Sequence, residues 1–73
     1  MIEVRLFATL REGRGKILKL DAAEFAVAGD IVRHLDIPME EVAILLINGF
    51  HQKPETEVKD EDVVSLFPAV GGG

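Results

Sequence analysis

The chain has 73 residues, 48% of them hydrophobic, and no cysteine, so it has to fold around a small apolar core without disulfides or thiolate metal sites. A net charge of −5 and an aromatic set of only four phenylalanines argue against a nucleic-acid partner, which needs a basic surface. The longest apolar run, VAILLI, is far too short to span a membrane, and the alternating start MIEVRLF is unlike a signal peptide, which favours a cytoplasmic protein without a membrane partner.

Two strands are predicted first. Residues 2–8 (IEVRLFA) alternate between apolar and mostly charged side chains, which places Ile2 and Leu6 on one face and Phe7 on the other. A loop with two glycines and several charges follows, and residues 16–20 (KILKL) predict a second short strand. We therefore expect these two strands to form a β-hairpin with a long loop.

A helix is predicted next, over about residues 26–36. Its apolar positions recur at i, i+3, i+4 and i+7, which gives one apolar stripe: Ala28, Ile31, Val32 and Leu35. Pro38 ends the helix, because the residue before a proline avoids helical geometry. Asp21 and Glu24 resemble a capping box that would begin it earlier. Gly29 inside the helix costs about 1 kcal/mol relative to alanine, which favours the later start.

Two further strands complete the pattern. Residues 42–48 (VAILLIN) are apolar on both faces, which is typical of a strand that is buried on both sides or faces a partner. The pair Asn48-Gly49 is a strong turn signal, residues 51–62 form a polar connection, and residues 63–67 (VVSLF) predict the last strand.

The order strand, strand, helix, strand, strand predicts an α+β fold of two layers, with one main helix packed on one face of a mixed sheet of four to five strands. We expect a single domain over residues 1–68. The three final glycines predict a flexible tail over residues 69–73, because glycine loses more backbone freedom on ordering than any other residue.

Four segments carry a resemblance to a known family, and together they cover essentially the whole chain. They are VRLFATLRE near the start, VAGDIVRHLDIP in the helix, LLINGF before the turn and KDEDVVSLFPAVGGG at the end. These segments resemble the MoaD/ThiS sulfur carriers, which have the ubiquitin-like β-grasp fold. LFATLRE and LFPAV are closer to MoaD, the small subunit of molybdopterin synthase. Two positions depart from the family pattern, Glu61 where a glycine is usual and Ala69 where a second proline is usual.

The resemblance implies a carrier that is not itself an enzyme and binds no cofactor or metal of its own. An E1-like partner would use ATP to adenylate the carboxyl group of Gly73, and sulfur would then convert it to a thiocarboxylate. The sulfur would go to molybdopterin synthesis through a MoaE-like large synthase subunit, or, in a ThiS-like alternative, to a thiazole synthase in thiamin synthesis. A ubiquitin-like protein modifier and an interaction module with an idle tail are also compatible with the pattern.

The residues themselves agree with this chemistry. Without cysteine the chain cannot hold sulfur as a persulfide, which leaves a C-terminal carboxyl group as the place for it. Gly71 and Gly72 would let the backbone pass through a narrow channel to the reacting group, because they lack a Cβ. When extended, the segment from Pro68 to Gly73 reaches roughly 20 Å into a partner. The alternative is that the glycines form a loose chain end without function.

A partner surface is predicted on the sheet face opposite the helix. If Val64 and Leu66 pack on the helix, Phe67 points the other way, as Phe7 does, and Pro68 follows directly in the chain. The middle strand must add one parity of side chains to this face, for which we select Ile44 and Leu46. A contiguous exposed apolar patch suits docking, whereas scattered exposed apolar side chains need no explanation.

The remaining polar candidates favour structural roles. His34 in the last helical turn suits the helix dipole, and Ser65 has no predicted base beside it. The run Asp60-Glu61-Asp62 predicts a solvated turn, with a basic partner surface as the alternative. Charge is unevenly divided: residues 1–19 hold five basic and two acidic side chains, a net of +3, and the remainder carries a net of −8.

Overall fold

The computed structural model describes residues 1–69, and it contains five strands, one α-helix and three short 3-10 helices. In chain order they are β1 (Ile2–Leu6), η1 (Ala8–Arg11), β2 (Ile17–Leu20), η2 (Ala22–Glu24), α1 (Ala28–His34), η3 (Met39–Glu41), β3 (Val42–Ile47), β4 (Phe50–His51) and β5 (Val63–Pro68). Of the predicted tail, Ala69 is the only residue inside the described range. No helix in residues 1–69 is long and apolar enough to cross a membrane.

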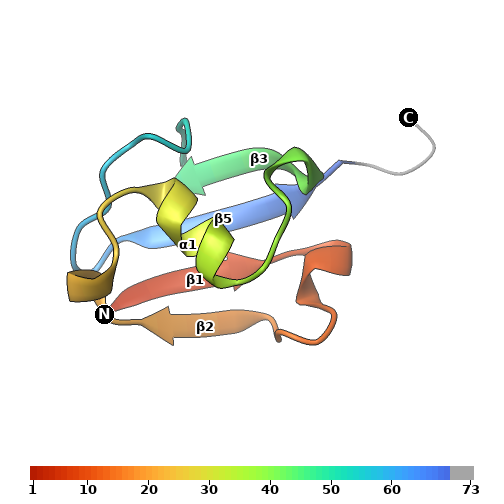
Figure 1. Ribbon diagram of the computed structural model, residues 1–73, viewed down its shortest axis with the longest axis horizontal. Coiled ribbons are helices and arrows are strands. Elements are labelled where there is room, and N and C mark those ends of the chain that lie inside the picture. The colour runs from red at the N-terminus through yellow and green to blue at the C-terminus, as the bar shows by residue number, and fades with distance from the viewer. Residues whose placement is uncertain (70–73) are drawn as a thin grey trace.

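The strands form one mixed sheet in the order β2-β1-β5-β3-β4 (Figure 1). β1 and β5 lie side by side and run parallel. β2 runs antiparallel to β1, and β3 runs antiparallel to β5. The first and last strands of the chain are therefore central in the sheet. Their parallel register, which pairs Val4 with Val64 and Leu6 with Leu66, brings the ends of both strands to the same edge.

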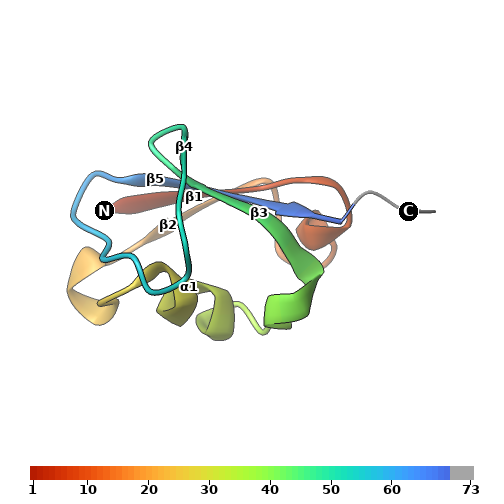
Figure 2. The same cartoon turned by 90° about the horizontal axis from the view of Figure 1, so that it is seen from above.

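The helix covers only one face of this sheet (Figure 2). α1 and η3 lie on one side, and the hairpin that contains β4 rises on the other side. The core between sheet and helix consists of buried aliphatic side chains: Ile2, Val4, Leu6, Leu10, Ala28, Ile31, Val32, Ile37, Leu45, Ile47, Val58, Val64 and Leu66. This is the mixed, one-helix β-grasp sheet that the sequence predicted.

The alternation of the strands explains which side chains enter the core. Val4, Leu6, Val64 and Leu66 are each at most 1% exposed. Their neighbours Arg5 and Phe67 are on the other face, because successive side chains of a strand point to opposite faces. The predicted hairpin of β1 and β2 is confirmed by their antiparallel pairing.

The helix is shorter than the predicted span of residues 26–36. Val27 is still extended and forms a bridge to Glu57, and Asp36 takes a positive φ of 56° that ends the helix. Asp21 does cap a helical turn, but the turn is η2, where its carboxylate accepts a hydrogen bond from the Ala23 N–H at 3.0 Å.

Gly29 lies in the first turn of α1, pressed against the chain at Pro54. Its N–H donates to the Pro54 carbonyl oxygen at 2.8 Å, and a Cβ on Gly29 would lie 3.3 Å from that oxygen. The close approach of two backbone segments accounts for the glycine, in spite of its unfavourable helix propensity.

The strand β4 is absent from the sequence prediction, which includes His51 in the polar connection. Asn48 and Gly49 have φ values of 53° and 87°, the positive pair that a tight hairpin turn requires. The chain therefore folds back on β3, and Ile47 pairs with Phe50. The predicted turn is confirmed, and the two-residue strand is its consequence.

Arg14 joins the loop between β1 and β2 to the end of the helix. Its guanidinium group donates to the carbonyl oxygens of Leu35 at 2.9 Å, Asp36 at 3.2 Å and Leu10 at 3.2 Å. The last carbonyls of a helix have no partner within the helix, so this side chain supplies donors that α1 lacks. Nothing in the local sequence pattern indicated this contact.

Candidate functional site

The ends of β1 and β5 place two phenylalanines together on the open face of the sheet. The Phe7 N–H donates to the Leu66 carbonyl oxygen at 3.2 Å, which fixes Phe7 beside the end of β5. The rings of Phe7 and Phe67 stack with their centroids 4.1 Å apart and their planes 10° apart. Both side chains are half-buried. The pair lies directly before the last described residues of the chain, Pro68 and Ala69.

The middle strand extends this aromatic pair. Ile44 of β3 lies opposite Phe67 in the register, and Leu46 lies opposite Ser65. Leu45 and Ile47, with the other parity, are 6% and 7% exposed and belong to the core. Ile44 is 38% exposed and Leu46 is half-buried. We call these four side chains the open-face patch: Phe7, Ile44, Leu46 and Phe67.

Pro68 is the last residue of β5 and lies beside the open-face patch. It pairs with Val42 in the register and is half-buried. The predicted docking residues are therefore gathered on and beside one face, and their role in docking stays a prediction. Gly71, Gly72 and Gly73, which carry the expected chemistry, lie outside the described residues.

A strained residue turns the chain next to the patch. Ala8 has a φ of 53°, in the left-handed region that costs a non-glycine residue about 1–2 kcal/mol. The short helix η1 begins at this residue and ends at Arg11. The Arg11 guanidinium carbon lies 5.5 Å from the centre of the Phe7 ring. No sequence signal indicated this arrangement, because an alanine gives no sign of a left-handed conformation.

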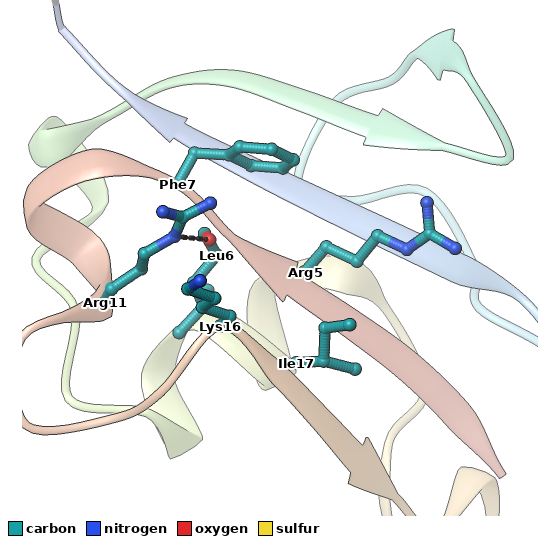
Figure 3. A pocket seen from close by; sticks show the side chains of 6 residues that line it. All are labelled: Arg5, Leu6, Phe7, Arg11, Lys16 and Ile17. Atoms are coloured by element: carbon teal, nitrogen blue, oxygen red, sulfur yellow. Dashed lines mark hydrogen bonds between the residues drawn. The ribbon is translucent and has the colours of Figure 1, made fainter.

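A hollow of about 220 Å³ lies beside Phe7 on the side of the strand β2. It is lined by three basic side chains and three apolar ones: Arg5, Arg11, Lys16, Leu6, Phe7 and Ile17 (Figure 3). Three of the five basic side chains noted in residues 1–19 thus surround one hollow. We call this site the basic hollow.

One carboxylate on the same face is already paired with basic side chains. Glu3 accepts from the Lys19 ammonium group at 2.8 Å and pairs with Arg5. Lys19 first and Arg5 second hold the pKa of Glu3 below its ordinary value. Just before β1, a hydrogen bond from the Met1 amino group lowers the pKa of Asp60.

The remaining polar candidates do not gather into a site. His34 is in the last turn of α1 with its ring 5.2 Å from Phe25, and His51 is exposed on β4. Ser65 lies on β5 between Arg5 and Leu46. Within residues 1–69 there is no group of three or more His, Asp or Glu side chains that could hold a metal ion.

Glu61 explains one departure from the family pattern. It has a φ of 71° in the turn before β5, in the region that glycine occupies most easily. Glu61 therefore takes the conformation for which a glycine at this position would be favoured.

Known proteins resemble this chain in both sequence and structure. The sequence matches the model of the ThiS family over residues 4–73. It is 32% identical to small archaeal modifier protein 3 of Haloferax volcanii, with 99% of this chain and 98% of that protein covered. The crystal structure of SAMP1 from Haloferax volcanii is similar, with a TM-score of 0.79, 25% identity and coverage of 99% and 98% of the two chains. A chain of the complex of subunits 1 and 2 of molybdopterin-converting factor from Helicobacter pylori shares the fold, with a TM-score of 0.66, 23% identity and coverage of 99% and 97%.

Proposed function

This chain belongs to the ThiS family, and from that premise we propose that it is a sulfur carrier whose reacting group is the carboxyl group of Gly73. In the first step a carboxylate oxygen attacks the α-phosphorus of ATP, an acyl-adenylate forms and pyrophosphate leaves. In the second step hydrosulfide attacks the acyl carbon and AMP leaves, which gives a thiocarboxylate. If the donor is a persulfide, an acyl disulfide forms first, and a thiol then cleaves its S–S bond to release the thiocarboxylate and a disulfide of the donor. The E1-like partner supplies the catalytic groups for both steps, and this chain supplies the substrate carboxyl.

The observation that carries the proposal is the placement of the open-face patch at the end of β5. Phe67 is the last aromatic residue before the glycines, and its stacking on Phe7 anchors it to the neighbouring strand. A partner that covers this patch lies beside Ala69. From there residues 69–73 span at most about 18 Å when extended, which is enough to reach a buried site in the partner.

We propose molybdopterin synthesis as the receiving pathway and a MoaE-like subunit as the second partner. The Helicobacter pylori complex supports this choice, because in it a protein of this fold is joined to a second subunit of molybdopterin-converting factor. Delivery to a thiazole synthase uses the same carrier chemistry and is the alternative within the family. Because ATP is an intracellular substrate, we place the reaction in the cytoplasm.

A second candidate function is protein modification. It is favoured by the relative from Haloferax volcanii, which is named a small archaeal modifier protein and is 32% identical. In that reaction a lysine amine of a target protein, in place of sulfur, attacks the same acyl carbon, and either AMP leaves from the acyl-adenylate or an enzyme thiol leaves from a thioester. The product is an amide between Gly73 and the target.

The experiment is an intact-mass measurement on the chain purified from its host without acid treatment. A carrier shows a species in which one sulfur replaces one oxygen, formed again in vitro with ATP, a sulfur donor and the host's E1-like enzyme. Deletion of Gly73, or one alanine added after it, abolishes this species and leaves thermal unfolding unchanged. Amide-linked conjugates without thiocarboxylate would establish the modifier instead, and an unmodified mass under all these conditions would overturn both functions.

A further inference from the structure

The basic hollow is unusual in this chain because the chain as a whole is acidic. Its three basic side chains come from β1, η1 and the residue before β2, and they surround a small apolar floor (Figure 3). A protein with a net charge of −5 repels acidic partners over most of its surface. The hollow is a local exception to that repulsion, and it directly adjoins the open-face patch through Phe7.

The three basic side chains differ in how far their charge is compensated. Arg5 is paired with Glu3. Arg11 donates from Nε to the Leu6 carbonyl oxygen at 2.8 Å, which holds its guanidinium group against Phe7. Within residues 1–69 no carboxylate lies within 4.0 Å of a charged nitrogen of Arg11 or Lys16. Arg11 and Lys16 are therefore two cations at the rim of the basic hollow that have no charged partner within the described residues.

We propose that the basic hollow receives an aspartate or glutamate side chain of the protein that captures the tail, and this inference rests on the proposed function. The carboxylate lies between the terminal amino groups of Arg11 and the ammonium group of Lys16. The methylene part of the acidic side chain packs against Phe7 and Ile17, of which Ile17 is 58% exposed. Charge complementarity and apolar contact then act at the same place.

A protein side chain fits this position better than a free anion because the hollow and the patch form one surface. Phe7 belongs to both, and its ring is stacked on Phe67. A partner that covers the Phe7 ring therefore lies beside the hollow as well. Because Leu6 pairs with Leu66, the hollow lies beside the end of β5, so a carboxylate seated there fixes the partner in register with the start of the tail.

We expect the carboxylate contact in the basic hollow to speed the association of the two proteins and to fix their relative position. Its contribution to the affinity of the final complex should be smaller. A charge pair at the rim of an interface mainly changes the association rate and its dependence on salt. Both effects weaken when the Debye length falls from about 10 Å at 0.1 M salt to about 3 Å at 1 M. Loss of the pair should therefore raise the KM for the carrier and leave kcat unchanged.

The test uses the host's ATP-dependent E1-like enzyme and measures its steady-state kinetics with this chain as the varied substrate. Lys16→Glu is expected to raise KM about tenfold at 0.05 M salt, and Lys16→Gln by a smaller factor, with kcat retained. The increase shrinks at 0.5 M salt. Lys53→Glu is the matched control: it changes net charge equally on the exposed connection between β4 and β5, and its KM stays near wild type.

Three different results would overturn the inference or its premise. Equal KM values for Lys16→Glu and Lys53→Glu, with active wild type, overturn the carboxylate contact and leave the proposed function standing. Inorganic phosphate that perturbs the NMR signals of Arg11 and Lys16, while Lys16→Glu keeps the wild-type KM, would make the hollow a small-anion site and overturn the proposal. A wild-type chain that is never adenylated overturns the proposed function itself.

Discussion

The two faces of the sheet are built from the same strands and have opposite properties. On the covered face, Ile31 and Val32 of α1 belong to the same core cluster as Val64 and Leu66 of β5, and all four are fully buried. On the open face, Phe67 and Ile44 from the same region of the sheet are half-buried or exposed. The open face also carries charged and polar side chains, such as Arg5 and Ser65, and no helix covers it.

This contrast shows that the chain of 73 residues keeps some of its large apolar side chains outside the core. A domain of this size has only a small core. Each apolar side chain outside that core fails to give the domain the stabilisation that its burial would provide. Phe7 and Phe67 nevertheless stand outside it, stacked on each other. We interpret the covered face as the source of stability and the open face as the surface that recognises partners.

The largest expected effect compares the same substitution on the two faces. Ile31→Ala removes a fully buried side chain and should lower the free energy of unfolding by about 2–5 kcal/mol. Ile44→Ala, at a position 38% exposed, should lower it by about 1 kcal/mol or less. Chemical denaturation of both variants measures the difference.

For partner binding we expect the opposite order, with a larger loss of affinity for Ile44→Ala than for Ile31→Ala. Ile44→Ala weakens capture by the E1-like enzyme, and Ile31→Ala, studied at a temperature where it is folded, binds like wild type. Equal losses of stability from the two substitutions would contradict the division between the faces. Equal losses of binding would contradict the docking role of the open-face patch.

A smaller effect concerns Arg14, which closes one end of the covered face. Arg14→Ala leaves the carbonyl oxygens of Leu35 and Leu10 without this donor and should cost about 1–3 kcal/mol in unfolding free energy. Arg14→Lys keeps the charge but loses the planar fork, so its stability should lie between wild type and Arg14→Ala. Lys16→Ala, in the same loop, is the control and should change little. An Arg14→Ala variant as stable as wild type would show that water replaces these bonds without cost.

The sequence predicted the layers and faces of the fold because those depend on periodicity. The alternation in residues 2–7 and 63–67 places the apolar side chains on the correct faces, although Ala8, predicted in the first strand, already belongs to η1. The stripe that contains Ile31 finds the buried side of the helix. The turn at Asn48-Gly49 was found because positive φ favours those two residue types.

Several features were missed because they depend on contacts between distant segments. The start of α1 is set by the bridge from Val27 to Glu57, and the tie made by Arg14 reaches the far end of the helix. The basic hollow could be suspected from the net charge of residues 1–19, but its position beside Phe7 depends on the left-handed Ala8. The face of Phe7 and Phe67 followed from strand parity, whereas the choice of Ile44 and Leu46 on the middle strand was one of two possible parities. The expected chemistry of Gly73 came mainly from the resemblance and stays a prediction.

The smallest expected effect compares two carboxylates, one beside each face. Asp30 of α1 accepts hydrogen bonds from the backbone N–H groups of Val27 at 3.2 Å and Ala26 at 3.0 Å and pairs with Arg33. Val27 first and Ala26 second lower the pKa of Asp30, whereas the pKa of Glu3 on the open face is lowered by the charged side chains of Lys19 and Arg5.

Both carboxylates have a lower pKa in the folded chain than in the unfolded one, so each contributes stability that is complete above the ordinary range near pH 4. Each contribution is lost as the pH falls through the folded-state value. Salt should separate the two, because exposed ion pairs are screened and backbone hydrogen bonds at a helix start are not. Denaturant unfolding between pH 2 and 6 checks this with the variants Asp30→Asn and Glu3→Gln. At 1 M salt the pH-dependent difference from wild type should shrink for Glu3→Gln and persist for Asp30→Asn, and equal screening of both would mean that Asp30 acts through Arg33 instead.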